Sequence, residues 1–289
     1  MICEMAGKHT CPVRPMRDAD VSAAVVVAEE AFGTRSGDES SARRASARIR
    51  HLLRTDPGGA FVAERDERVV GVALALLREG LWYLSLLTVL PSEQGAGAGG
   101  ALFHKALAYG QRSDTGMITS SDDPRAQALY ARAGFDLRAT VQAEGTLDRA
   151  RLPAPHPGVR TLAASELEAL AAVSRTLRGA SHTTDLQFAQ AHGSLVLGLE
   201  DRGLAVVLPG RGVMMLAARD EPAAQALLWH ALEAAGETDE PLVRWITAEQ
   251  IWAIPVARRA GLRLTPYGAL AVRGRPGPLR PYLPWGSFG

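Results

Sequence analysis

A glycine-rich segment has the residue types and the spacing that could do chemistry in this 289-residue sequence. Residues 94–100 read Gln-Gly-Ala-Gly-Ala-Gly-Gly, between a strand-like apolar run at 81–90 and an amphipathic helical pattern after residue 100. Glycines let the backbone turn tightly and approach a ligand, and they leave main-chain N–H groups free at the positive end of a helix. The position of the glycines directly before a helix therefore predicts a phosphate or pyrophosphate site instead of a merely flexible loop.

A dinucleotide-binding fingerprint is one interpretation of these glycines. Gly95, Gly97 and Gly100 have its spacing, and Asp122 lies about where a ribose-binding acid could stand. Against it, residues 91–94 separate the strand from the first glycine, and the preceding strands form a meander instead of opening a parallel βαβ unit. The pair Asp123-Pro124 is also explained as the start of a helix.

The same residues resemble the acyl-CoA signature of the GNAT superfamily of N-acetyltransferases, Q/R-x-x-G-x-G/A, which here reads Gln-Gly-Ala-Gly-Ala-Gly from Gln94 to Gly99. A second motif resembles a later helix of the family. It runs from Arg125-Ala126 through Leu129-Tyr130 to Gly134-Phe135, with the tyrosine four residues before the glycine. Two signatures in the family's order are more specific than either alone, and the resemblance extends over residues 13–147.

The resemblance implies acetyl-CoA as the acyl donor and direct attack by a substrate amine in a ternary complex. It implies that Tyr130 donates a proton or a hydrogen bond to the leaving thiolate. It also implies a set of cofactor-binding residues, in which three strand residues pair with the pantetheine arm through their backbone and a loop entered at Gln94 holds the pyrophosphate: Leu87, Thr88, Val89, Gln94, Gly95, Ala96, Gly97, Ala98, Gly99 and Gly100. Many relatives carry a glutamate in the strand before the loop, but residues 81–90 contain no acid. The base is therefore open between water, a residue elsewhere such as Glu30, and deprotonation before binding.

Apolar periodicity predicts the elements that must position these residues. Strand-like runs at 60–64, 69–77 and 81–90 are separated by short breaks, which favour an antiparallel meander. A short strand at 117–120 precedes a helix with Asp123 as its cap and Gly134 after its end. The predicted fold class is α/β, with two tandem GNAT-like domains, each a mixed, mostly antiparallel twisted sheet flanked by helices.

The second half repeats the element order of the first with weak identity. We expect a first domain at 1–150 with a flexible leader at 1–11, a proline-rich linker at 151–158, and a degenerate second domain with a Pro/aromatic tail at 159–289. The second half has Asp220 and Glu221 where the first has glycines, and Ala257 where the first has Tyr130. We therefore expect it to bind no CoA and to serve as a scaffold or pocket wall, with the tail aromatics buried.

Composition narrows the function classes. The formal net charge of +1 gives no strong field for nucleic acid or an anionic membrane, and no apolar run approaches the ~20 residues that span a bilayer. The two cysteines, Cys3 and Cys11, predict neither a disulfide framework nor a metal site, so we expect a cytoplasmic protein without a metal. The expected partner is a small-molecule or peptide amine acceptor, for a monomer or homodimer. The alternatives are a non-catalytic acyl-CoA sensor or partner protein and a dinucleotide-binding oxidoreductase.

Overall fold

The computed structural model describes residues 11–33, 39–238 and 241–289. Contacts between Cα atoms group the chain into two compact units. The first unit contains the chain up to Leu77 together with Leu84–Arg112, and the second contains Arg78–Tyr83 together with Ser113–Gly289. This grouping follows three-dimensional contacts, and it does not coincide with the predicted domain boundary at 151–158, which stays a prediction. Cys3 and most of the predicted leader lie outside the described residues.

The first unit is built on the predicted meander. Its strands are β1 (Val13–Pro15), β2 (Ala60–Arg65), β3 (Arg68–Arg78) and β4 (Leu81–Val89), of which β3 and β4 begin or end in the second unit. β1 pairs antiparallel with β2, and β2 pairs antiparallel with β3 with Val62 opposite Val72. β4 follows β3 in the strand order after the two-residue turn Glu79-Gly80. Both turn residues have positive φ, which suits the twist of a tight hairpin.

Three helices complete this unit: α1 (Val21–Phe32), α2 (Glu39–Thr55) and α3 (Ala98–Tyr109). α1 and α2 pack against each other, and α3 packs on β1 and β2. Gly71 in β3 allows the close approach of α3, because a Cβ there would lie 2.8 Å from Leu102 Cδ1. The far end of α3 is fixed by Tyr109, whose hydroxyl donates to the buried carboxylate of Asp56 at 3.1 Å. These contacts hold the start of α3, which carries the glycine loop, in a defined position.

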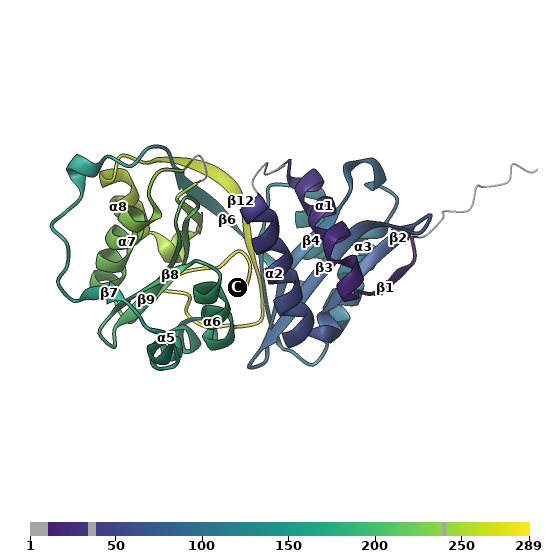
Figure 1. Ribbon diagram of the computed structural model, residues 1–289, viewed down its shortest axis with the longest axis horizontal. Coiled ribbons are helices and arrows are strands. Elements are labelled where there is room, and N and C mark those ends of the chain that lie inside the picture. The colour runs from purple at the N-terminus through teal and green to yellow at the C-terminus, as the bar shows by residue number, and fades with distance from the viewer. Residues whose placement is uncertain (1–10, 34–38, 239–240) are drawn as a thin grey trace, which may run out of the picture. The chain divides into compact units, whose positions relative to one another are not determined.

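The second unit contains a strand arrangement that crosses the two halves of the sequence. The beginning of β4 pairs parallel with β5 (Thr115–Ser120), and the order then continues through β12 (Arg263–Arg273), β6 (Asp136–Glu144) and β11 (Val243–Ile246). β12 pairs antiparallel with both β5 and β6, so a strand of the second half lies between two strands of the first (Figure 1). β11 in turn pairs with β6.

A second sheet has the order β13-β10-β9-β8-β7, antiparallel throughout. Its strands are β7 (Val159–Thr161), β8 (Leu195–Leu199), β9 (Gly203–Leu208), β10 (Gly212–Ala218) and β13 (Tyr282–Leu283). The helices of this unit are α4 (Pro124–Arg132), α5 (Leu167–Arg178), α6 (Thr183–Ala191), α7 (Glu221–Ala235) and α8 (Ala253–Arg259).

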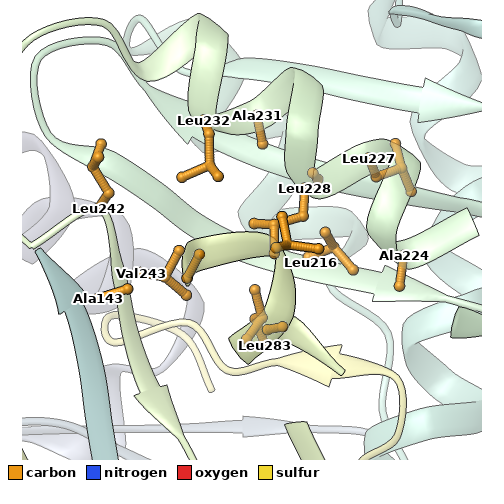
Figure 2. Close-up of a cluster of buried hydrophobic side chains, with 14 of the residues drawn as sticks. Ala143, Leu216, Ala224, Leu227, Leu228, Ala231, Leu232, Leu242, Val243 and Leu283 are labelled. Carbon is orange, nitrogen blue, oxygen red and sulfur yellow. The ribbon is translucent and has the colours of Figure 1, made fainter. Parts of the chain in front are cut away.

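A buried apolar cluster joins both sheets of the second unit through α7. Leu228 and Leu232 on α7 face Leu216 of β10 and Val243 of β11, and Leu283 of the tail closes the cluster (Figure 2). Each of these side chains is at most 2% exposed. The burial of apolar area here supplies the main driving force for this part of the fold.

The predicted α/β class is confirmed in its coarse form: a mixed sheet, antiparallel except where β4 meets β5, with helices packed against it. The predicted leading helix pair, meander and capped helix are all present. None of the helices in the described ranges is long and apolar enough to cross a membrane.

Candidate functional site

The glycine loop lies between β4 and α3 in the first unit, as predicted. β4 ends at Val89, a 3-10 turn covers Pro91–Glu93, and α3 begins at Ala98 with Gly97 as its N-cap. Gly95 and Gly97 have φ of +86° and +90°, a region that side chains with a Cβ avoid at a cost of about 1–2 kcal/mol. A Cβ on either residue would meet no protein atom within 4 Å. The glycines are therefore required by backbone conformation, and the space in front of them is open.

The start of α3 presents main-chain N–H groups to that space. The N–H of Ala101 bonds back to the carbonyl oxygen of Gly97 at 3.1 Å, so the N–H groups that precede it belong to the open first turn. Glu93, the acid in the preceding turn, pairs with Arg65 at 3.1 Å, which offsets its negative charge. Open N–H groups and the helix dipole make this end of α3 favourable for an anion.

The predicted strand residues run directly into the loop. Leu87 is half-buried, and Thr88 and Val89 are buried. The hydroxyl of Thr88 has no hydrogen-bond partner among the residues that the structure describes, although its oxygen is buried. Gln94 does not extend away from the strand: its side-chain amide donates to the carbonyl oxygen of Val89 at 3.0 Å. Gln94 thus fastens the loop to the strand, a contact that motif spacing did not predict.

The dinucleotide interpretation does not fit this context. β4 is the last strand of an antiparallel meander, whereas the fingerprint needs the first strand of a parallel unit. The 3-10 turn Pro91–Glu93 also separates β4 from the first glycine.

Tyr130 lies on α4 in the second unit. The predicted cap is confirmed, because the Asp123 carboxylate accepts the N–H of Arg125 at 2.9 Å, and Gly134 follows the helix with φ of +82°. The side chain of Tyr130 is 5% exposed, and burial raises the pKa of its phenol well above the usual value. The phenol therefore keeps its proton at neutral pH, which suits a donor and excludes a base.

Trp82 and Tyr83 are fully buried at the start of β4, where the parallel pairing with β5 ends. Trp82 packs on Phe135, with ring centroids 5.8 Å apart. Tyr83 shares a hydrogen bond with the hydroxyl of Thr119, and it lies 3.1 Å from the carbonyl oxygens of Trp285 and Gly286. Both residues pack within the second unit.

Glu30, one of the candidate bases, is exposed on α1. Ser85, in the part of β4 that belongs to the first unit, accepts a hydrogen bond from Arg48 at 3.3 Å.

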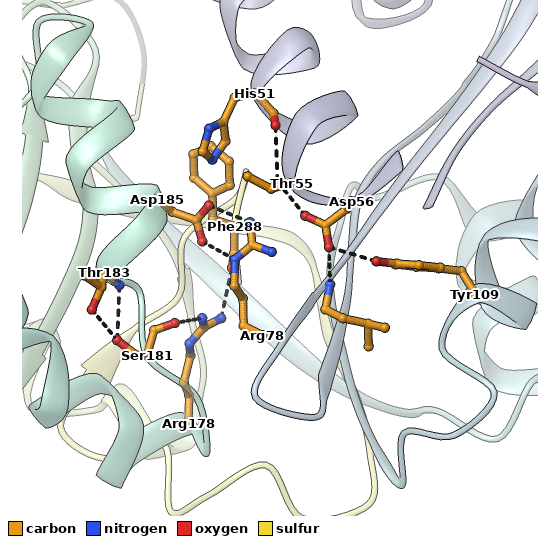
Figure 3. A network of polar contacts seen from close by, with 11 residues as sticks. His51, Thr55, Asp56, Arg78, Tyr109, Arg178, Ser181, Thr183, Asp185 and Phe288 are labelled. Atoms are coloured by element: carbon orange, nitrogen blue, oxygen red, sulfur yellow. Dashed lines mark hydrogen bonds and ion pairs between the residues drawn. The ribbon is translucent and has the colours of Figure 1, made fainter. Parts of the chain in front are cut away.

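A polar cluster in the second unit was not found from the sequence. The carboxylate of Asp185, which has no exposed surface, accepts two hydrogen bonds from the guanidinium of Arg78 at 2.8 and 2.9 Å (Figure 3). Arg178 is also fully buried, and it donates to the carbonyl oxygens of Ala180, Ser181 and Phe288. Because Arg78 and Asp185 are far apart in the chain, no local pattern could have paired them.

His182 belongs to the same region and has a structural place in it. It is completely buried, and its Nε2 lies 2.9 Å from the hydroxyl of Tyr282. Burial, with the positive charges of Arg178 and Arg78, holds the pKa of His182 well below its ordinary value. His192, the other histidine singled out by the sequence, is exposed and bonds to the carbonyl oxygen of Phe188. Within the described part of the chain, no group of three or more potential ligands is placed to hold a metal ion.

The helix that begins near Asp220 and Glu221 has an acid at its terminus. Asp220 caps α7 by accepting the N–H of Ala223 at 2.9 Å, and it pairs with Arg202. Glu221 occupies the first turn of α7. The carboxylate of Asp220 therefore satisfies one N–H group of this helix terminus.

Comparison with known proteins agrees with this geometry. Residues 26–135 match the Acetyltransferase (GNAT) family. Uncharacterized N-acetyltransferases of Mycobacterium tuberculosis and Mycobacterium bovis are 37% identical over 106 residues, which cover 34% of this chain and 66% of theirs, so the chain spans less than two thirds of these relatives.

Solved structures resemble the fold over the whole chain. A putative acetyltransferase from Pyrococcus horikoshii has a TM-score of 0.82 at 17% identity and covers 100% of this chain and 99% of its own. A GCN5-related N-acetyltransferase from Sphaerobacter thermophilus has a TM-score of 0.59 at 18% identity, with 93% and 97% covered. With the family match, the two signatures and the open helix terminus together, residues 26–135 of this chain form a domain of the GNAT family of acetyltransferases.

Proposed function

We propose that this protein transfers an acetyl group from acetyl-CoA to a primary amine of a small molecule or peptide, within a ternary complex. The observation that carries the proposal is the glycine loop, which leaves open N–H groups at the start of α3 directly after β4. An anionic pyrophosphate fits such a terminus, and the family match covers these residues.

The proposed binding roles follow the strand and the loop. The backbone of Leu87, Thr88 and Val89 pairs with the amides of the pantetheine arm, as an added strand would. The N–H groups between Gly95 and Gly100 hold the pyrophosphate. Gln94 acts indirectly, because its side chain ties the loop to Val89.

The proposed chemistry needs one proton donor from the chain. The amine nitrogen attacks the thioester carbonyl carbon, a C–N bond forms, and the C–S bond breaks. Tyr130 gives its phenolic proton, or a hydrogen bond, to the leaving sulfur. The proton that the sulfur gains is balanced by the proton that the amine loses. Burial raises the pKa of the Tyr130 phenol, so the phenol is protonated when the thioester is attacked. General acid help of this kind is typically worth about 10²–10⁴-fold in rate.

The second half is proposed to be a diverged, tandem copy that binds no CoA and serves as a scaffold or as a wall of the acceptor pocket. The closed terminus of α7, with Asp220 and Glu221, supports this role because carboxylates there repel a pyrophosphate. A cytoplasmic location and a monomeric or homodimeric state remain part of the proposal.

A calorimetric titration tests the donor. We expect acetyl-CoA to bind at one site per chain with micromolar affinity, and NADH and NADPH to give no saturable heat. Saturable dinucleotide binding without acetyl-CoA binding would overturn the proposal.

A non-catalytic acyl-CoA sensor is the second candidate, favoured by the absence of an acid from β4. A thiol-release assay with a broad amine panel separates the two. Turnover with any amine supports the enzyme, whereas tight acetyl-CoA binding without turnover across the panel supports the sensor.

A further inference from the structure

The segment from Arg280 to Gly289 follows a defined path across the second half. It begins beside the first turn of α7, where the guanidinium of Arg280 donates to Glu221 through Nε at 2.8 Å. Glu221 stands at the helix terminus that corresponds, in the repeated element order, to the glycine loop of the first half. At this terminus the carboxylate of Asp220 accepts the N–H of Ala223, and the segment itself provides the cation that pairs with Glu221.

The segment then pairs with β10 of the five-stranded sheet. Tyr282 and Leu283 form β13, antiparallel to β10, with Tyr282 opposite Ala217 and Leu283 opposite Leu216. The N–H of Ala218 also donates to the carbonyl oxygen of Pro281 at 3.2 Å. β10 has the same place before α7 that β4 has before α3. The edge of β10 that pairs with β13 is the counterpart of the edge at Leu87, Thr88 and Val89.

Beyond β13 the segment is held deep in the second unit. The hydroxyl of Tyr282 bonds to His182 and donates to the carbonyl oxygen of Gly289. Arg178 donates to the carbonyl oxygen of Phe288 at 2.9 Å. Tyr282, Trp285 and Phe288 are each at most 3% exposed. Every part of this segment is therefore bound, from the helix terminus to its buried end.

These contacts have the order of an acyl donor: first the helix terminus, then the strand edge, then a buried end. We propose that the segment Arg280–Gly289 occupies, in the second half, the track that acyl-CoA occupies in the first, and so replaces a second cofactor. The inference rests on the proposed function, including the second half as a diverged copy. Its chemical basis is that pantetheine and polypeptide both carry amides that pair with a strand edge.

The test uses an acyl arm without the diphosphate, because the carboxylate of Glu221 repels anions at this terminus. S-acetylpantetheine and the segment should compete for the edge of β10. In the wild-type chain the segment is covalently attached and so has a high effective concentration at the edge of β10. Competition becomes measurable when the binding of the segment to this edge is weakened. Leu283→Ala does this in the full-length chain, because Leu283 is 2% exposed in the core cluster.

Hydrogen–deuterium exchange of residues 279–289 is the readout. In Leu283→Ala, saturating S-acetylpantetheine should speed exchange of these amides at least threefold. Leu228→Ala is the matched control, since it removes a leucine of α7 from the same cluster and leaves the sequence of the segment unchanged. In Leu228→Ala, S-acetylpantetheine should change the exchange rate of residues 279–289 less than 1.5-fold. Arg280→Gln, at an exposed ion pair, weakens the segment without a cavity and repeats the test in a variant whose core is intact.

Unchanged exchange of residues 279–289 in Leu283→Ala and Arg280→Gln would overturn the proposal, and so would an equal effect in Leu228→Ala. A different result of the same experiment would contradict the proposed function. If the arm leaves the amides of Leu87–Val89 unprotected and the intact chain binds no acetyl-CoA, the first half is not the donor site, whatever happens at β10.

Discussion

The hydroxyl of Tyr83, at the point where β4 stops pairing with β5, lies 3.1 Å from the main-chain carbonyl oxygen of Trp285. Both side chains are buried, at 0% and 3% exposed. Tyr83 is in β4 and Trp285 is in the segment Arg280–Gly289. This hydrogen bond therefore ties that segment to β4 within the second unit. The hydroxyl also contacts Thr119 and the carbonyl oxygen of Gly286, so one phenol organises three partners.

Tyr83→Phe should lower the free energy of unfolding by about 1–3 kcal/mol, because buried carbonyl oxygens lose their donor while the ring stays in place. Urea unfolding followed by circular dichroism measures the change. Tyr267→Phe, at a half-buried tyrosine of β12, is the control and should have a smaller effect. A Tyr83→Phe protein as stable as the wild type would show that the contact with Trp285 contributes nothing.

The buried pair Arg78–Asp185 predicts a strongly non-additive mutant cycle. Asp185→Ala leaves the Arg78 guanidinium, 11% exposed, without its carboxylate and should cost about 3–5 kcal/mol. The double variant Arg78→Met with Asp185→Leu should lie closer to the wild type, since no charge is left buried. Urea unfolding of Arg78→Met, Asp185→Leu and the double variant gives the coupling. The exposed pair Arg160–Glu166 is the control, and the cost of Glu166→Ala should be much smaller. Additive effects at Arg78 and Asp185 would contradict the prediction.

Tyr130→Phe tests the proposed proton donor. We expect kcat to fall about 10²-fold or more with an accepted amine, with the affinity for acetyl-CoA within about twofold of the wild type. The assay is thiol release, and calorimetry gives the affinity. Tyr267→Phe is the control, because it removes a half-buried phenol of β12 that has no part in the proposed chemistry. Equal rates for wild type and Tyr130→Phe would remove Tyr130 from the mechanism.

Local signals predicted much of this structure. Asp123 caps α4 and Gly134 ends it, because capping and left-handed turns depend on a few neighbouring residues. The positive φ of Gly95 and Gly97 follows from the same kind of local requirement. The burial of the tail aromatics, expected from three large rings in a short segment, is also confirmed.

Non-local partners could not be predicted in this way. The pattern of residues 263–273 indicates a strand, but it does not say that this strand lies between β5 and β6. Arg78 and Asp185 are too far apart in the sequence for any spacing to indicate their pairing. Arg178 and Tyr83 contact backbone carbonyl oxygens, and since every residue has one, the sequence does not indicate which of them is the partner. The predicted binding residues of β4 and the loop lie together because they are contiguous. The role of Tyr130 stays a prediction.

Gly97→Ala should weaken acetyl-CoA binding at least tenfold. The substitution strains a residue with φ of +90° and moves the N–H groups at the start of α3, although its Cβ meets no protein atom within 4 Å. Calorimetry measures the affinity. Gly193→Ala is a matched control with φ of +92° and equally open space, so it carries the same strain of about 1–2 kcal/mol but should bind acetyl-CoA as the wild type does. Equal weakening in both variants would point to general destabilisation instead of a site effect.

His182 should make the protein less stable as the pH falls below about 6.5. Its pKa in the folded state is held well below 6.5 by burial and by the charges of Arg178 and Arg78, so the folded protein keeps it neutral while the unfolded chain takes up a proton. The contribution is complete above the unfolded pKa and is lost on acidification, by at most about 1.4 kcal/mol for each pH unit.

Urea unfolding at pH 7.5 and 5.5 measures this effect, and the wild type should lose about 1.4 kcal/mol from His182 alone over that interval. His182→Gln should be less stable at both pH values, because the Tyr282 hydroxyl changes its partner, but its stability should fall less between them. His192→Gln, at an exposed histidine, should retain the wild-type pH dependence. If His182→Gln keeps the full wild-type dependence, then the buried imidazole does not resist protonation, and the acid sensitivity has its origin in the carboxylates that pair with arginines.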